Sequence, residues 1–258
     1  MLLETIQYAA TLPVTPKPFR PFILYSVNLW SRAGRCAKDW AAHEAQCQTF
    51  VRDTVSGMRE RRTVVVLGSG LLRDVPMAFL AKTFDTVVLV DLVHLASVRM
   101  WLSARRIRNV RLISRDLSGF DDVLAGRETE PLAFLRQVPW LDLVISANIL
   151  SQIGVGATRR LEADKSGDTT EVVQKLIAAH LNGLAGLPCK VALLTDTRYR
   201  VSGRTGHVRE DSDLLHGITP PPAAAQWSWP VAPLGEESRD YQVVHDVIAT
   251  AVFGRRTD

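Results

Sequence analysis

The residues best suited to bind a ligand stand where short apolar runs end. The first run, residues 63–67, is followed by Gly68 and Gly70, and a second run at residues 86–90 is followed by Asp91. Glycine lets a chain turn sharply and approach a ligand closely, because it has no Cβ. A carboxylate can accept hydrogen bonds from the hydroxyls of a ribose. The pattern therefore predicts a site for a nucleoside-type ligand.

The residues after the second glycine separate three classes of cofactor. A phosphate-binding P-loop requires a lysine and a hydroxyl residue there, but the chain has Leu71 and Leu72. A dinucleotide-binding turn requires a third glycine where Arg73 stands. Pro76 is tolerated only in the first turn of a helix, so we expect the next helix to begin near Asp74, after a wider turn. A wider turn suits S-adenosylmethionine, which has no phosphate, better than NAD, which stays the alternative.

Periodicity predicts an α/β protein. The two runs do not alternate between polar and apolar residues, as expected for strands buried on both faces of a parallel sheet. Trp227 and Trp229, two residues apart in a predicted strand, should share one face of it. Prolines predict an extended arm over residues 1–28, and residues 154–168 and 207–222 are predicted to be loops. We expect further strands at residues 110–113, 141–147, 190–195, 226–231 and 241–247, and helices at residues 29–58 and 171–184.

With these elements the chain resembles the class I S-adenosylmethionine-dependent methyltransferase superfamily. The resemblance rests on residues 66–70 (VLGSG), 88–91 (VLVD), 114–117 (SRDL) and 141–150 (LDLVISANIL). It implies a Rossmann-like, doubly wound, mostly parallel sheet of seven strands with a C-terminal antiparallel hairpin. It also implies a catalytic domain at residues 59–258, preceded by an N-terminal arm and helical cap at residues 1–58. The family usually has an acid two residues before the first glycine, where this chain has Val66.

The resemblance implies S-adenosylmethionine as the cofactor, bound at the carboxyl ends of the first four strands. The residues implied to bind it are Gly68, Ser69, Gly70, Asp91, Leu92, Asp116, Leu117 and Asn148. Asp116 could accept a hydrogen bond from the adenine amino group, while the next backbone N–H reaches a ring nitrogen. The alternative is that Asp116 caps the segment 117–124 as the N-terminus of a helix.

The implied activity is methyl transfer to a small molecule. The sulfonium of the cofactor is already an activated leaving group, so such an enzyme mainly aligns the acceptor with the methyl group in a dry site. Gln152 stands where many small-molecule methyltransferases have a histidine, and its amide cannot act as a base near neutral pH. His43 lies in the helix predicted at residues 29–58, which either covers the substrate or only covers an edge of the sheet. The candidate catalytic residues are Asn148, Gln152 and His43.

Composition limits the remaining functions. The net charge is +4 and the pI is about 9.1, but no dense block of lysine and arginine is present, so a small molecule is favoured over nucleic acid as the partner. An RNA methyltransferase, another S-adenosylmethionine-dependent group transfer and a non-catalytic cofactor-binding or interaction protein stay open as alternatives. No apolar stretch is long enough to span a membrane, so we expect no membrane partner. Three cysteines are too few for a disulfide framework, which indicates a cytoplasmic protein.

Cys36, His43 and Cys47 share one predicted helix and resemble a set of metal ligands. The two cysteines are 11 residues apart in sequence, which places them roughly 16 Å apart along a helix axis. Metal–ligand bonds of about 2.0–2.3 Å cannot join two side chains at that distance. We therefore expect no metal site from this helix, and we interpret both cysteines as buried structural residues.

Overall fold

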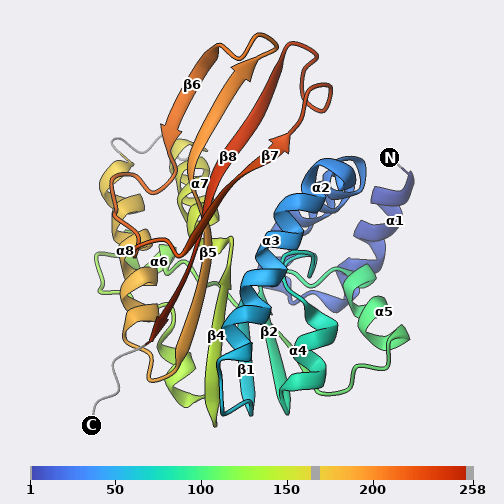
Figure 1. Ribbon diagram of the computed structural model, residues 1–258, viewed down its shortest axis with the longest axis vertical. Coiled ribbons are helices and arrows are strands. Elements are labelled where there is room, and N and C mark those ends of the chain that lie inside the picture. Colours follow the sequence, from blue (N-terminus) through green and yellow to red (C-terminus); the bar gives the residue numbers. More distant parts are fainter. Residues whose placement is uncertain (1, 164–168, 254–258) are drawn as a thin grey trace.

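In a computed structural model of the protein, which describes residues 2–163 and 169–253, the chain is built around one twisted sheet (Figure 1). Within these residues the sheet has eight strands in the order β3-β2-β1-β4-β5-β8-β7, with β6 paired to β5 outside this path. Strands β1 to β5 run parallel, whereas β8 runs antiparallel to both β5 and β7. The predicted doubly wound, mostly parallel sheet with a C-terminal antiparallel hairpin is thus confirmed, with β6 as one strand more than the seven expected.

The predicted strands and helices occur in the predicted order, and the corrected boundaries are given below. The strands are β1 (Thr63–Leu67), β2 (Thr86–Asp91), β3 (Val110–Ser114), β4 (Leu141–Ala147), β5 (Lys190–Gly203), β6 (Val208–Asp213), β7 (Ala225–Ala232) and β8 (Tyr241–Phe253). The α-helices are α1 (Leu2–Thr11), α2 (Ile23–Arg35), α3 (Ala37–Ser56), α4 (Met77–Thr83), α5 (Ala96–Ala104), α6 (Phe120–Leu124), α7 (Ile149–Ala163) and α8 (Thr170–Ala185). None of the described helices combines the length and the apolar composition needed to cross a membrane.

Helices cover both faces of the sheet, which explains why the sequence of β1 is apolar almost throughout. Every residue of β1 is buried, as expected from its lack of alternation. Val64 and Val66 pack in one core with residues of α3, α4 and α5, whereas Val65 and Leu67 pack in a second core with Leu184 of α8. Successive side chains of a strand point to opposite faces, so a strand between two helical layers must be apolar at every position. The buried sheet therefore holds the carboxyl ends of its strands rigidly in place.

The N-terminal region differs from its prediction, because residues 1–28 do not form an extended arm. The stretch Leu2–Thr11 contains no proline and forms α1, and short 3-10 helices at Leu12–Val14 and Lys17–Phe22 follow it. Pro13 and Pro18 lie in the first turns of these 3-10 helices, where the missing N–H has no helical partner to lose, and Pro21 lies inside the second. The helix expected at residues 29–58 is in fact two helices, α2 and α3, which are separated at Cys36.

Three further boundaries are corrected. Helix α4 begins at Met77 with Pro76 at its N-cap, later than the expected start near Asp74. Residues 154–163 belong to α7 and not to a loop, because Gly154 lies against the α8 side chain of Ile177, at 3.4 Å from the place that a Cβ would occupy. The rest of that predicted loop, residues 164–168, lies outside the described residues. Strand β6 lies within the loop expected at residues 207–222, and β5 continues well past residue 195.

Beyond the carboxyl ends of the parallel strands, the last four strands continue as an extension of the sheet (Figure 1, top). We call residues 197–213 and 225–246 the strand extension. Strand β8 pairs with β5 from Lys190 to Gly203, with an irregularity between Asp196 and Arg198 where the extension begins. Helix α3 packs against β7, and the indole N–H of Trp40 donates to the carbonyl of Val231 at 3.3 Å. The N-terminal helices and the strand extension therefore meet at the carboxyl edge of the sheet.

Candidate active site

The turn after β1 brings the first glycine, Gly68, against the end of β4. Gly68 and Gly70 both have positive φ angles, of 70° and 45°, a region that side chains with a Cβ rarely adopt. A Cβ on Gly68 would lie 2.8 Å from the carbonyl oxygen of Ala147 and 3.0 Å from Cβ of Ile149. The first glycine is thus required by its backbone conformation and also by the close approach of two strand ends. The buried hydroxyl of Ser69, between the glycines, has no hydrogen-bond partner among the described residues.

Asp91 at the end of β2 holds the glycine turn through its carboxylate. Its Oδ2 accepts from the backbone N–H of Gly70 at 2.7 Å, and its Oδ1 accepts from that of Leu92 at 2.7 Å. Burial raises the pKa of Asp91, and the Gly70 N–H opposes this effect by stabilising the carboxylate. Each oxygen accepts one backbone bond at short range and retains a second lone pair, which can accept from a ligand hydroxyl.

His94 lies beside Asp91 and presents a second unsatisfied atom. Its Nε2 lies 3.1 Å from the carbonyl oxygen of Ile113, so Nε2 carries the proton in the neutral ring. Burial lowers the pKa of His94, partly opposed by the charge of Asp91, and this favours the neutral ring. The lone pair on Nδ1 is buried and has no partner within the described part of the chain.

Asp116 and Leu117 follow β3, as expected, and Asp116 has a local structural bond. Its Oδ1 accepts from both the backbone N–H and the hydroxyl of Ser118, at 2.8 and 2.7 Å. This turn precedes α6, whose N-cap is Gly119, so Asp116 does not itself cap the helix. The Oδ2 atom is free of hydrogen bonds to the described residues, and the adenine role predicted for Asp116 stays a prediction.

Asn148 ends β4 in a left-handed backbone conformation, with a φ of 52°. Its backbone N–H donates to the carbonyl of Leu194 in β5. Its side-chain Nδ2 donates to Oδ2 of Asp74 at 2.9 Å and lies 3.5 Å from Nε2 of His43. The amide oxygen Oδ1 is buried without a partner among the described residues. Asn148 therefore presents one unsatisfied acceptor at the junction of the glycine turn and β4.

The structure brings His43 and Asn148 together, as two of the three residues predicted to be catalytic, but it places His43 out of reach of solvent. The His43 side chain is fully buried and stacks on the Trp229 ring at a centroid distance of 4.0 Å. The indole N–H of Trp227 donates to His43 Nδ1 at 3.0 Å, which confirms that the two tryptophans share one face of β7. His43 Nε2 lies 3.4 Å from Oδ1 of Asp74. Both ring nitrogens are thus engaged inside the protein.

The third predicted catalytic residue, Gln152, lies apart from this group. It is exposed on α7, two residues beyond Leu150, whose side chain is fully buried. Periodicity explains the difference, because residues 150, 153, 157 and 161 form the apolar stripe of α7 and position 152 falls outside it.

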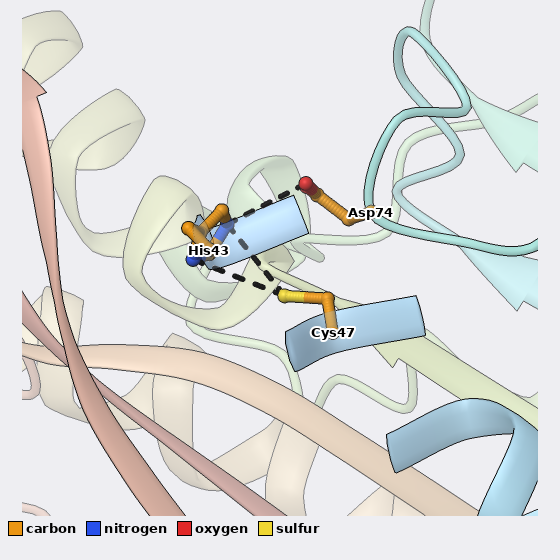
Figure 2. A group of neighbouring side chains, drawn as sticks. All are labelled: His43, Cys47 and Asp74. Carbon is orange, nitrogen blue, oxygen red and sulfur yellow. Dashed lines mark hydrogen bonds and ion pairs between the residues drawn. The ribbon is translucent and has the colours of Figure 1, made fainter. Parts of the chain in front are cut away.

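His43, Cys47 and Asp74 form a group that resembles a metal centre more closely than the set of Cys36, His43 and Cys47 considered from the sequence (Figure 2). One ligand atom from each lies within 4.8 Å of the others. However, an indole N–H can only donate, so the bond from Trp227 requires the lone pair of the His43 ring on Nδ1. The neutral ring then carries its proton on Nε2, the nitrogen that faces Cys47 and Asp74. Burial also raises the pKa of the Cys47 thiol, and a metal requires the thiolate. The group is therefore chemically suited to hydrogen bonding rather than to metal binding.

Sequence reasoning missed a second histidine at this edge. His245 of β8 donates from Nδ1 to Oδ2 of Asp196 at 2.7 Å, which leaves the Nε2 lone pair without a hydrogen bond to any described residue. The ring packs edge-on against Tyr199 and Trp229, its neighbours on adjacent strands. The signal in the sequence was the position of His245, which lies on the same face of its strand as the apolar Val243 and Val247.

These atoms can be compared with the needs of S-adenosylmethionine. Its ribose offers hydroxyls, its adenine offers an amino group and ring nitrogens, and its tail carries an ammonium and a carboxylate. The crevice has a turn that a Cβ would fill and a carboxylate that holds it. It also has three buried polar atoms without partners in the described residues, on Ser69, His94 and Asn148. The residues present fit the cofactor.

Comparisons with known proteins return no match to a family model and none to a curated protein. Solved structures with some likeness include the N-methyltransferase NodS from Bradyrhizobium japonicum, in complex with S-adenosylhomocysteine, at 11% identity and a TM-score of 0.36 over 79% of this chain and 86% of that one. Another is 1,6-didemethyltoxoflavin-N1-methyltransferase from Burkholderia thailandensis, at 15% identity and a TM-score of 0.39 over 86% and 85% of the two chains. The YcgJ protein of Bacillus subtilis has 12% identity and a TM-score of 0.41 over 80% and 98%.

The fold is assigned from the strand order of the chain itself and not from these similarities. Five parallel strands in the order 3-2-1-4-5, continued by an antiparallel pair, with a glycine turn after the first, define the class I methyltransferase type of Rossmann-like fold. The fold expected from the sequence is therefore confirmed.

Proposed function

We propose that the protein is an S-adenosylmethionine-dependent methyltransferase that acts on a small molecule. The observation that carries this proposal is the arrangement at the ends of β1, β2 and β4. The glycine turn is bonded to Asp91 through Gly70. Gly68, which has no room for a Cβ, lies against Ala147 and Ile149. Between these two residues stands Asn148, whose amide oxygen lacks a partner among the described residues. The cofactor would supply a methyl group already activated on a sulfonium. The chain must then bind, orient and exclude water.

On the cofactor side, each predicted residue has a role that its contacts allow. The two Asp91 oxygens hold the N–H groups of Gly70 and Leu92 and would also accept from the ribose hydroxyls. Asp116, through its Oδ2, would accept from the adenine amino group, and Leu117 would line the adenine ring. Gly68 and Ser69 provide the backbone surface beneath the tail.

On the acceptor side, we assign proton removal to His245 rather than to His43. The Asp196 carboxylate fixes the proton on Nδ1 of His245, so the lone pair on Nε2 is available to an acceptor O–H or N–H. The aromatic rings of Tyr199 and Trp229 flank the imidazole and exclude water from it. His43, with both nitrogens engaged, acts as a positioning residue for Asp74, which in turn accepts from the amide of Asn148.

The test of the proposal is binding followed by transfer. Calorimetry with S-adenosylhomocysteine and with NAD should give binding of the former only. The purified protein is then incubated with a small-molecule extract and cofactor bearing a labelled methyl group, and mass spectrometry should find the label in a small molecule. Preferential binding of NAD would overturn the proposal, and so would label recovered only in RNA. Binding without transfer to any extract would favour a non-catalytic protein.

A further inference from the structure

We propose that Asp74 and Asn148 form the subsite for the ammonium group of the cofactor's amino-acid tail. This inference rests on the proposed function and names the residues that recognise one part of the cofactor. It starts from the side chains of Figure 2, in which Asp74, from the turn after β1, points toward His43 of α3. The strand that precedes this turn supplies no charge, because none of its residues is ionisable and Val66 is fully buried in the core.

Asp74 is held in place but not enclosed. Its Oδ2 accepts from Nδ2 of Asn148 at 2.9 Å, and its Oδ1 faces Nε2 of His43 at 3.4 Å. The tautomer fixed by Trp227 puts a proton on that Nε2, so the imidazole donates to the carboxylate. These two donors are neutral, so the negative charge of Asp74 has no cation beside it within this group. About 30% of the side chain is exposed, which leaves part of the carboxylate open to a ligand.

Asn148 adds the second acceptor. Its Nδ2 is committed to Asp74, and Oδ1 of the same planar amide is buried without a partner among the described residues. An alkylammonium has three N–H donors and no acceptor. It matches a carboxylate and an amide oxygen on one side of a crevice, whereas an anionic ligand group would be repelled there.

The position of this pair agrees with the shape of the cofactor. Asp91 ends β2 and Asn148 follows β4, with β1 between them. Neighbouring strands lie about 4.8 Å apart, so the two sites are roughly 10 Å apart across the sheet. A ribose at Asp91 thus places the far end of a flexible tail of several bonds near Asn148. Asp91 is bonded to the glycine turn and Asp196 is paired with His245, so of these three acids Asp74 is the one left for the ammonium group.

The experiment compares two ligands that differ by the tail. Calorimetry measures the Kd of S-adenosylhomocysteine, which has the ammonium group, and of 5′-methylthioadenosine, which lacks the amino-acid tail. The proteins are the parent, Asp74→Asn, Asn148→Gly and Asp91→Asn, each checked for folding by thermal melting. Glycine at 148 accepts the left-handed backbone of that position and so removes the amide without strain.

We expect Asp74→Asn to weaken S-adenosylhomocysteine binding about 10- to 100-fold, the range for a lost hydrogen bond to a charged group. Binding of 5′-methylthioadenosine should stay within twofold of the parent. Asn148→Gly should show the same selectivity with a smaller loss, and Asp91→Asn should weaken both ligands. Unchanged S-adenosylhomocysteine binding in folded Asp74→Asn, or equal losses for both ligands, would overturn the subsite. A parent that binds neither ligand would instead overturn the proposed function. A chelator that abolishes the parent's binding would assign Asp74 to a metal.

Discussion

Replacing Gly68 by alanine tests the closest contact at the candidate site. The new Cβ would lie 2.8 Å from the Ala147 carbonyl oxygen, and its backbone would have to keep a φ of 70°. The left-handed conformation costs about 1–2 kcal/mol for a residue with a Cβ. Overpacking typically costs about 1–3 kcal/mol, and the neighbour here is backbone that cannot rotate away. We therefore expect the free energy of unfolding to fall by about 2–5 kcal/mol.

Variants at two other glycines measure the cost of the left-handed backbone separately from the cost of overpacking. Gly126 also has a positive φ, of 69°, but nothing lies within 4 Å of its Cβ position, so Gly126→Ala should lose only about 1–2 kcal/mol. Gly156 lies in α7 with open space around it and without a positive φ. Gly156→Ala should stabilise the protein by about 0.5–1 kcal/mol through helix propensity.

Urea unfolding of the three variants and the parent gives these free energies directly. Binding of S-adenosylhomocysteine to each folded variant is measured alongside. Only Gly68→Ala should lose ligand affinity, because only this change pushes the glycine turn away from β4. If Gly68→Ala unfolds at the same urea concentration as Gly126→Ala and binds the ligand as the parent does, the close approach inferred between the two strand ends is wrong.

Four other variants, one of them a control, test the roles of three histidines. Burial lowers the pKa of His180 to about 4. Between pH 6.5 and 4 the unfolded chain therefore binds more protons than the folded one, and the parent should lose roughly 3 kcal/mol of stability as the pH falls. The His180→Gln variant should not show this loss in the same acid titration. His245→Gln should lower kcat about 100-fold or more, with a smaller loss of kcat at high pH and with unchanged cofactor affinity. The control His207→Gln, at an exposed position, should match the parent in the same assays. Trp227→Phe removes the donor that fixes the ring of His43, so calorimetry should detect tighter zinc binding than in the parent; equal zinc affinity would contradict the tautomer assigned here.

The cofactor side of the site was predictable because its residues are local to strand ends. Gly68, Asp91 and Asn148 each follow an apolar run, and parallel strands bring their carboxyl ends to one edge. The N-terminal arm was mispredicted because prolines were taken to exclude helices. In fact they occupy 3-10 turns and leave the proline-free Leu2–Thr11 free to form α1.

The acceptor side was less predictable, because its contacts join segments far apart in sequence. No local pattern relates His43 to Trp227, which are 184 residues apart, or His245 to Asp196. Asp74 was expected at the start of a helix, and its role as a partner of Asn148 depends on the turn that delays α4 until Met77. Such pairings are set by the packing of α3 against the sheet rather than by the residues around each side chain.

The bonds between the first helices and the strand extension bear on the order in which the site can form during synthesis. Arg35 of α2 forms an ion pair with the nearly buried Glu236, which is 201 residues later in the chain. Contacts of such large sequence separation form late in folding, because they close long loops. Residues 63–148, which hold the cofactor side, can associate on the ribosome well before residue 227 emerges. The nascent chain would therefore form the crevice for the nucleoside first. The catalytic base His245 and the aromatic ring of Trp229 beside it would be added last.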